Sequence, residues 1–188
     1  MSELTALTAL GATEPRIEHH GAVSLRENAG LALASVAVLG RDGAQPLPFG
    51  LRLPEPGHWV AGQGVSAFWT GPGQWMIEAE GRAEEDFARD VKAHAPGCAV
   101  SEQTDGWVAV EIASTEGAAP IEALLERLVN VDLGAFGPGA ATRTGLEHMS
   151  VFVIRRAADR VAILGMRSSA GSLWHAISVA ASRLQVPA

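Results

Sequence analysis

The sequence predicts an α+β fold with mainly antiparallel sheets and with helices packed on one face of each sheet. Three observations support this class. Apolar stretches with strand periodicity outnumber those with helical periodicity, four of the strands form two pairs around tight turns, and three helical segments each follow a strand. Because such hairpins outnumber strand–helix–strand crossovers, the sheets are expected to be antiparallel.

Size and composition describe a globular protein. The chain has 188 residues, of which 47% are hydrophobic and 19% charged, which suffices for one well-cored domain or two tightly packed subdomains. The 14 basic and 21 acidic residues give a net charge of −7, which argues against a surface that binds nucleic-acid phosphates. The single cysteine, Cys98, excludes an intramolecular disulfide and argues against a cysteine-based zinc site.

Neither a membrane anchor nor a secretory signal is visible in the sequence. The longest apolar stretch, 31–39, is about half as long as the roughly 20 residues that a spanning helix needs. The first 15 residues contain two glutamates and no basic region. We therefore expect a cytoplasmic protein that binds neither membranes nor nucleic acid.

The chain is predicted to consist of an extended N-terminal arm, 1–25, and a single α+β domain, 26–188. The arm is expected because its residues show no sustained period. The segment 45–64 holds four prolines and four glycines and is predicted to be a loop. Two related halves with their seam at this loop are an alternative that the sequence leaves open.

The expected strands and helices follow in order. The strands are 31–39, closed by a turn at 40–43, then 65–69 and 75–79 around Gly71-Pro72-Gly73, then 107–112, and finally 149–155 and 161–166 around Ala157-Ala158-Asp159. The first helix begins at the acidic residues 84–86, buries Phe87 and Val91, and ends before Pro96-Gly97. The second begins near Pro120 and buries Ile121, Leu124, Leu125 and Leu128, and the third covers about 169–184 with Ser168 or Ser169 as its cap.

The motifs that carry chemistry in other proteins are absent or lack their structural context. Gly62-Gln63-Gly64 opens a GxGxxA pattern, but the strand and turn that follow leave no room for the helix that a dinucleotide site requires. The six histidines show no metal-binding spacing, and Cys98 is expected to be a buried, inert thiol. The sequence therefore predicts no catalytic, cofactor-binding or metal-binding residue on this chain.

Tryptophan and arginine provide the candidates for contact with a partner. Five tryptophans in a chain of this size are mostly expected in the core, but the residue type is enriched in interface hot spots. The candidate interface residues are Trp69, Trp75, Trp174, Arg143 and Arg167. For each arginine, which suits bidentate pairing across an interface, an exposed position at a strand end is the alternative.

Four segments resemble, in the same order, segments of one known family. They are Thr70–Ile77 (TGPGQWMI), Asp105–Val110 (DGWVAV), Leu125–Leu133 (LERLVNVDL) with Phe136–Gly139 and Arg143-Thr144, and Arg167–Ala170 (RSSA) with Leu173-Trp174. The first is similar to the GPxxWL turn and strand of the gamma subunit of heterotetrameric sarcosine oxidase. Together the segments span about residues 65–182, roughly two thirds of the chain.

The resemblance implies a fold like the N-terminal core of the folate-binding aminomethyltransferases, to which the glycine cleavage T-protein belongs. It also implies a place in a complex that oxidises sarcosine to glycine and makes hydrogen peroxide, with the one-carbon unit leaving as formaldehyde or passing to tetrahydrofolate. FAD, FMN, NAD and the folate site would lie on the alpha and beta subunits, and a zinc-binding delta subunit would complete the assembly. The present chain would be the non-catalytic gamma subunit.

Two other functions remain open at this point. The chain could act by itself as a folate-binding, one-carbon-transfer protein with the same fold. It could also be a small-molecule-binding or scaffold protein unrelated to amine oxidation. The first of these alternatives requires a pocket with a carboxylate for the pterin ring, which the sequence does not identify.

Overall fold

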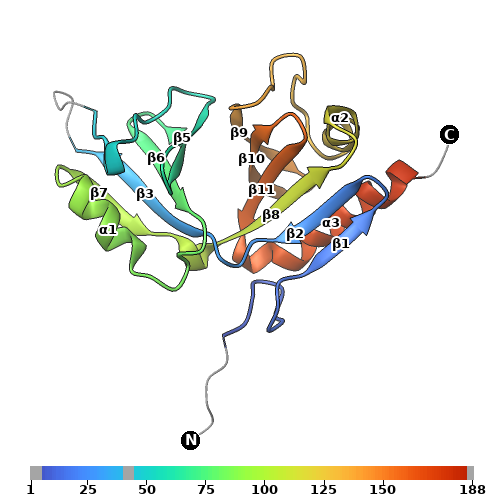
Figure 1. Ribbon diagram of the computed structural model, residues 1–188, viewed down its shortest axis with the longest axis horizontal. Helices are drawn as coiled ribbons and strands as arrows, with labels where there is room; N and C mark the ends of the chain where they lie inside the picture. Colours follow the sequence, from blue (N-terminus) through green and yellow to red (C-terminus); the bar gives the residue numbers. More distant parts are fainter. Residues whose placement is uncertain (1–5, 40–44, 186–188) are drawn as a thin grey trace, which may run out of the picture. The chain divides into compact units, whose positions relative to one another are not determined.

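The structure, a computed structural model, describes residues 6–39 and 45–185. It contains two antiparallel sheets and three α-helices (Figure 1), which confirms the predicted α+β class. The chain divides into two compact units. Unit 1 comprises 6–29, 106–138 and 143–185. Unit 2 comprises 30–39, 45–105 and 139–142.

Unit 1 is built on a six-stranded sheet with the order β1-β2-β8-β11-β10-β9. Its strands are β1 (Ile17–His20), β2 (Val23–Glu27), β8 (Trp107–Ser114), β9 (Ala141–Leu146), β10 (Met149–Ala157) and β11 (Arg160–Met166). Strand β8 pairs with β2 on one side and with β11 on the other, both antiparallel. The hairpin predicted around 157–159 is confirmed as β10 and β11.

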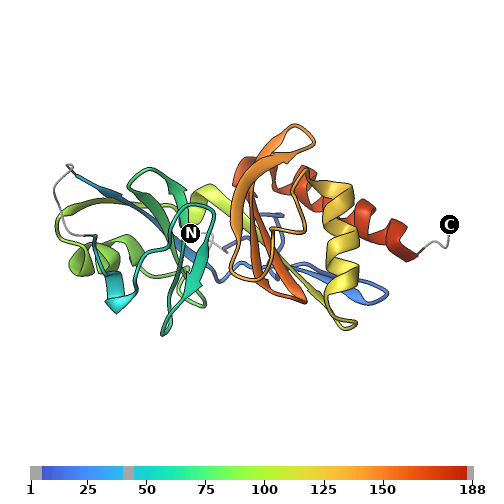
Figure 2. The same ribbon diagram turned by 90° about the horizontal axis from the view of Figure 1, so that it is seen from above.

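Two helices, α2 (Ala118–Leu128) and α3 (Ala170–Ser182), cover one face of this sheet (Figure 2). Most of their apolar residues are buried, as the side chains of Ile121, Leu124 and Leu173 illustrate, whereas Leu128 at the end of α2 is only partly buried. Helix α2 begins two residues before Pro120, because a proline fits within the first turn of a helix, where the amide groups have no intrahelical partner. Ser169 is the N-cap of α3, but its side chain makes no capping hydrogen bond.

Unit 2 is built on a five-stranded sheet with the order β4-β5-β6-β3-β7. Its strands are β3 (Ala32–Val38), β4 (Trp59–Ala61), β5 (Ser66–Gly71), β6 (Gln74–Ala79) and β7 (Cys98–Glu102), and its helix is α1 (Phe87–His94). Phe87 and Val91 of α1 are fully buried in a core with Val36 and Ile77. The hairpin predicted around Gly71–Gly73 is confirmed, with Gly73 in the left-handed conformation that the turn requires.

Short 3-10 helices connect several elements. They are Pro48–Gly50, Thr104–Gly106, Arg167–Ser169 and Arg183–Gln185. The turn expected at 40–43 lies outside the described residues.

The observed division differs from the expected arm and single domain. Within 1–25, whose first five residues lie outside the described part, β1 and the first residues of β2 belong to the sheet of unit 1. Strand β1 pairs with β2, and β2 pairs in turn with β8, which is about 90 residues away in the chain, as the pairing of Val23 with Ser114 shows. The place of this hairpin in the sheet therefore depends on a distant segment. The loop 45–64 contains β4 and lies within unit 2. The chain passes between the units at 29–30, 105–106, 138–139 and 142–143 instead.

Shortening the fully buried side chain of Leu124 should destabilise the protein. We expect Leu124→Ala to lower the free energy of unfolding by about 2–5 kcal/mol, because the substitution removes buried apolar surface and leaves a cavity under α2. Urea unfolding measures the change. Glu126→Ala, at an exposed position of the same helix, is the control and should change stability by less than about 0.5 kcal/mol; equal effects of the two variants would contradict the packing described.

Candidate functional site

Trp69 and Trp75, two of the candidate interface residues, lie opposite each other on β5 and β6. Trp75 is buried in the core of unit 2, and its Nε1 donates a hydrogen bond of 2.8 Å to the carbonyl oxygen of Pro54. Trp69 is partly buried against the same core. Trp69 therefore retains more surface for a partner than Trp75, whose exposed fraction is 7%.

Trp174 lies at the centre of a polar cluster between α3 and the edge strand β1. Its ring is 3% exposed, and its Nε1 donates a hydrogen bond of 2.9 Å to Glu18 Oε1. The hydroxyl of Ser178, one turn further along α3, donates to Glu18 Oε2 at 2.6 Å. Arg16 forms an ion pair of 2.9 Å with Glu18, and its guanidinium lies 5.4 Å from the centre of the Trp174 ring.

The electrostatics of this cluster keep Glu18 ionised. Burial by itself would raise the pKa of Glu18, but hydrogen bonds from Ser178, Trp174 and His20 and the charge of Arg16 lower it from 4.5 to about 2.

The cluster contains a serine, a histidine and a carboxylate, yet the serine hydroxyl donates to the carboxylate and lies 3.5 Å from His20 Nε2. A nucleophilic serine instead donates to the histidine, with the carboxylate behind it. The arrangement therefore attaches β1 to α3 and does not activate Ser178.

The two candidate interface arginines lie at the surface of unit 1. Arg143 on β9 is exposed, and its Nε donates a hydrogen bond of 2.8 Å to the Ser150 hydroxyl across the hairpin. It borders an open hollow of about 400 Å³ along β9 and β10. Arg167, which is partly buried, donates from Nη2 to the carbonyl oxygen of Leu7 at 2.9 Å. The cluster of Trp174 and the surfaces around these arginines are thus separate features.

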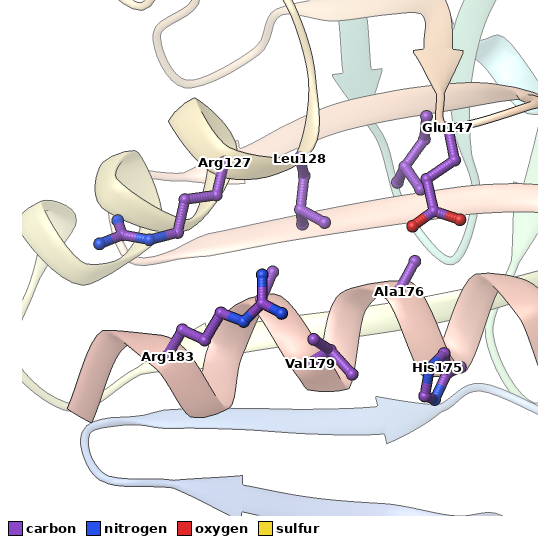
Figure 3. Close-up of a pocket in the computed structure, with 9 residues that line it drawn as sticks. Arg127, Leu128, Glu147, His175, Ala176, Val179 and Arg183 are labelled. Atoms are coloured by element: carbon purple, nitrogen blue, oxygen red, sulfur yellow. The ribbon is translucent and has the colours of Figure 1, made fainter. Parts of the chain in front are cut away.

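A groove that the sequence did not indicate lies between α2, α3 and the turn between β9 and β10 (Figure 3). Its volume is about 310 Å³. The apolar residues that line it are Leu128, Leu146, Ala176, Val179 and Ala180, and the polar ones are Arg127, Glu147, His175 and Arg183. Sequence periodicity had placed Leu128 in the core, but it does not show that a space remains between the two helices.

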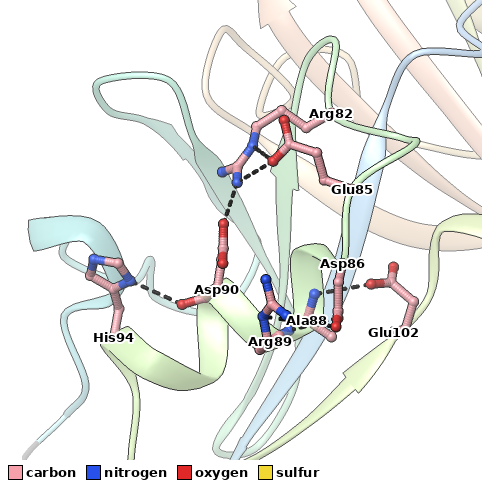
Figure 4. A network of polar contacts seen from close by, with 8 residues as sticks. All are labelled: Arg82, Glu85, Asp86, Ala88, Arg89, Asp90, His94 and Glu102. Carbon is pink, nitrogen blue, oxygen red and sulfur yellow. Dashed lines mark hydrogen bonds and ion pairs between the residues drawn. The ribbon is translucent and has the colours of Figure 1, made fainter.

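A second polar network holds α1 on the sheet of unit 2 (Figure 4). The Asp86 carboxylate caps the helix by accepting a hydrogen bond from the Arg89 amide. Glu102 of β7 accepts another from the Ala88 amide at 2.9 Å. Burial would raise the pKa of Glu102, but the hydrogen bonds of Thr104 and the nearby amides lower it.

Arg82 continues this network before the helix. Its guanidinium donates to Glu85 at 2.7 Å and to Asp90 at 2.6 Å, and the Asp90 carbonyl lies 2.9 Å from His94 Nδ1. These acidic residues therefore cap and fasten α1. The sequence had correctly indicated their place at the start of the helix, although it did not indicate Glu102.

The described residues offer little reactive chemistry. Cys98 is 4% exposed, as expected, and burial raises the pKa of its thiol, which disfavours the nucleophilic thiolate. Gly62 and Gly64 connect β4 to β5, and a strand follows them instead of a helix. Across 6–39 and 45–185, no three histidine, cysteine or acidic side chains gather where they could hold a metal ion. None of the helices in that part of the chain is long and apolar enough to cross a membrane.

Comparison with known proteins rests on structure. No protein-family model matches the sequence, and no curated protein matches it either. The chain is similar to a chain of the heterotetrameric sarcosine oxidase from Corynebacterium sp. U-96, solved in complex with pyrrole 2-carboxylate. The TM-score is 0.74 with 20% identity, over 92% of this chain and 90% of that chain.

The glycine cleavage system aminomethyltransferase T from Bartonella henselae is also similar, with a TM-score of 0.55 and 16% identity. The match covers 81% of this chain and 44% of the aminomethyltransferase, so this chain spans less than half of that protein. At such low identities the likeness establishes the fold. The expected relation to the aminomethyltransferase fold is therefore confirmed, and the chain shares this fold along nearly its whole length with a chain of sarcosine oxidase.

Removing the charge of Glu18 should destabilise the protein in a pH-dependent way. The lowered pKa of this carboxyl means that its ionised form stabilises the folded state above about pH 4.5, and that this contribution disappears as the pH falls toward about 2. We expect Glu18→Gln to lower the free energy of unfolding by about 1–2 kcal/mol at neutral pH, less than the full pKa shift because the side chain is partly exposed.

Urea unfolding of both proteins at neutral and acidic pH measures this difference. It should shrink as the solution is acidified through the range from 4.5 to about 2. Glu126→Gln, an exposed carboxylate of α2, is the control. A loss of stability in Glu18→Gln that stays constant at all pH values would contradict the electrostatic account.

Proposed function

We propose that this chain is the gamma subunit of a cytoplasmic sarcosine oxidase complex and that it contributes structure rather than catalysis. The observation that carries the proposal is the reciprocal match with a chain of heterotetrameric sarcosine oxidase, which covers 92% of this chain and 90% of that chain. The four sequence segments that resemble the gamma subunit support it independently, since they were identified without the structure.

The side chains described above also favour a structural role. The serine, histidine and carboxylate at Glu18 are arranged for attachment, and the acidic residues around α1 cap and fasten that helix. In the proposed complex, FAD, FMN, NAD and tetrahydrofolate bind to the partner subunits. This chain stabilises their assembly by mass action, because a protein that binds only the assembled form shifts the equilibrium toward that form.

The proposed partners are the alpha, beta and delta subunits, and the proposed interface includes Trp69, Trp75, Trp174, Arg143 and Arg167. Trp75 and Trp174 offer only narrow exposed edges, because they are buried in their own units. Trp69 and the two arginines have the accessible surface. Arginine at such a position can pair with a carboxylate of the partner through two parallel hydrogen bonds.

A second candidate function is one-carbon transfer by this chain alone. The likeness to aminomethyltransferase T favours it. Against it stands the extent of the match, which leaves more than half of that protein without a counterpart in this chain.

Co-expression with the two large subunits should test the structural role. We expect a yellow complex that oxidises sarcosine and makes hydrogen peroxide, whereas the isolated chain should be colourless and inactive. Absorption spectra and a peroxide assay measure both properties. The alternative predicts that tetrahydrofolate binds to the isolated chain, which titration calorimetry measures; turnover of sarcosine by the single chain would refute the proposed role.

Charge reversal at the proposed interface should weaken assembly. We expect Arg143→Glu and Arg167→Glu each to reduce the affinity of this chain for the large subunits by about tenfold, because each replaces an attractive contact with a repulsive one. Pull-down at a series of concentrations measures the affinity. Arg89→Glu, at an exposed position of α1, is the matched control, and a loss of affinity equal to that of the control would argue against these two contacts.

A further inference from the structure

The groove between α2 and α3 has the size and the walls of a small ligand site. Its volume of about 310 Å³ lies at the lower end of the range of roughly 300–1,000 Å³ for such sites. Residues of α2, α3 and the end of β9 form its floor. Among them, Leu146 of β9 and Ala176 of α3 are buried. Because packing of the helices on the sheet fixes these residues, the groove does not depend on a mobile loop to form.

The two ends of the groove carry opposite charge. Figure 3 shows Arg127 and Arg183 at one end and Glu147 with His175 at the other. Arg127 is partly engaged, since its Nη1 donates a hydrogen bond of 2.9 Å to the Ala123 carbonyl of its own helix. Within the part of the chain that the structure describes, no carboxylate pairs with the guanidinium of Arg183, which lies beside Leu128 in the groove.

The distance between the two ends limits the ligand. From Ala176 to Arg183, α3 and the turn after it advance by about 10 Å, at roughly 1.5 Å per residue. A carboxylate at Arg183 would form charge-assisted hydrogen bonds with the guanidinium, and the space toward Ala176 is lined by apolar side chains. A second anionic group at the far end would meet the carboxylate of Glu147.

We propose that this groove binds a small organic monocarboxylate, with its carboxylate at Arg183 and its unbranched apolar chain over Val179 and Ala176. Arg127 adds positive charge at the same end. The proposal is independent of the proposed subunit role, because the groove is lined by none of the proposed interface residues and binding is measured on this chain alone.

In the first experiment, the isotopically labelled full chain is titrated with acetate, butyrate and hexanoate, and the backbone chemical shifts are followed by NMR. Affinity should rise by about fourfold for each added methylene group, since each one buries apolar surface against the groove. Shifts should concentrate at Leu128, Val179 and Arg183. Affinity that does not depend on chain length, or shifts that centre elsewhere on the protein, would overturn the proposal.

Variants then test the charged ends. Arg183→Gln should weaken hexanoate binding by about tenfold, because the charge-assisted hydrogen bonds are lost. Arg160→Gln, an exposed arginine of unit 1 outside the groove, is the matched control and should bind hexanoate like the natural protein. Circular dichroism establishes that both variants are folded, and equal affinity of the two variants would refute the role of Arg183.

Ligands of different charge complete the test. Hexylamine should bind more weakly than hexanoate, because its ammonium group is repelled by Arg183 and is attracted only by Glu147 in the reversed orientation. Adipate should bind more weakly than hexanoate because its second carboxylate lies near Glu147. Glu147→Gln should remove most of this difference between adipate and hexanoate. Equal binding of hexylamine and hexanoate would show that the groove selects only apolar chains, contrary to the proposal.

Discussion

The pairing of strand β8 on both of its sides is the constraint on which unit 1 depends. This strand joins the N-terminal strands β1 and β2 to the C-terminal strands of the same sheet. Val108 of β8 lies opposite Gly165 of β11, and a Cβ at Gly165 would lie 2.9 Å from the Leu173 side chain of α3. The absence of a side chain at this position therefore allows α3 to approach the sheet closely. The positions of α3 and α2, and with them the groove between the two helices, follow from this packing.

Polar side chains in both units mainly complete the architecture. Glu18 accepts hydrogen bonds from two residues of α3, and Glu102 accepts one from the first turn of α1. In each case a carboxylate on a strand connects that strand to a helix. Because an ionised carboxylate with several donors is held in a fixed position and has a lowered pKa, it is poorly suited to accept a proton during catalysis at neutral pH.

The comparisons agree with this view of the molecule. The fold corresponds along nearly its full length to one chain of a heterotetrameric sarcosine oxidase and to less than half of an aminomethyltransferase. Arg143 and Arg167 form hydrogen bonds with Ser150 and Leu7, and neither arginine lines the groove. Partner contact and ligand binding would therefore use different residues of the same unit.

Local sequence patterns were sufficient for the elements whose signals lie within a few residues. The alternating strand of 107–112, the helical stripe of Ile121 and Leu124, and the Gly-Pro-Gly turn were all found where they were expected. Helix capping by the acidic residues near 86 was also indicated. Short-range backbone preferences and the period of apolar residues determine such features. The burial of Cys98 followed from the same reasoning.

Tertiary structure decided the features that depend on partners distant in the sequence. Strand β2 pairs with β8, about 90 residues away, and β1 pairs with β2 at the edge of the sheet. Trp174 and Ser178 lie four residues apart on one face of α3, which could have suggested a shared polar partner, but only the fold identifies it as Glu18. The groove likewise requires residues from α2, α3 and the β9–β10 turn. The sequence by itself determined the three helices and the strands of the two predicted hairpins, because those signals are local. The fold alone decided where the remaining strands form and which elements meet, because contacts between distant segments depend on how whole elements pack.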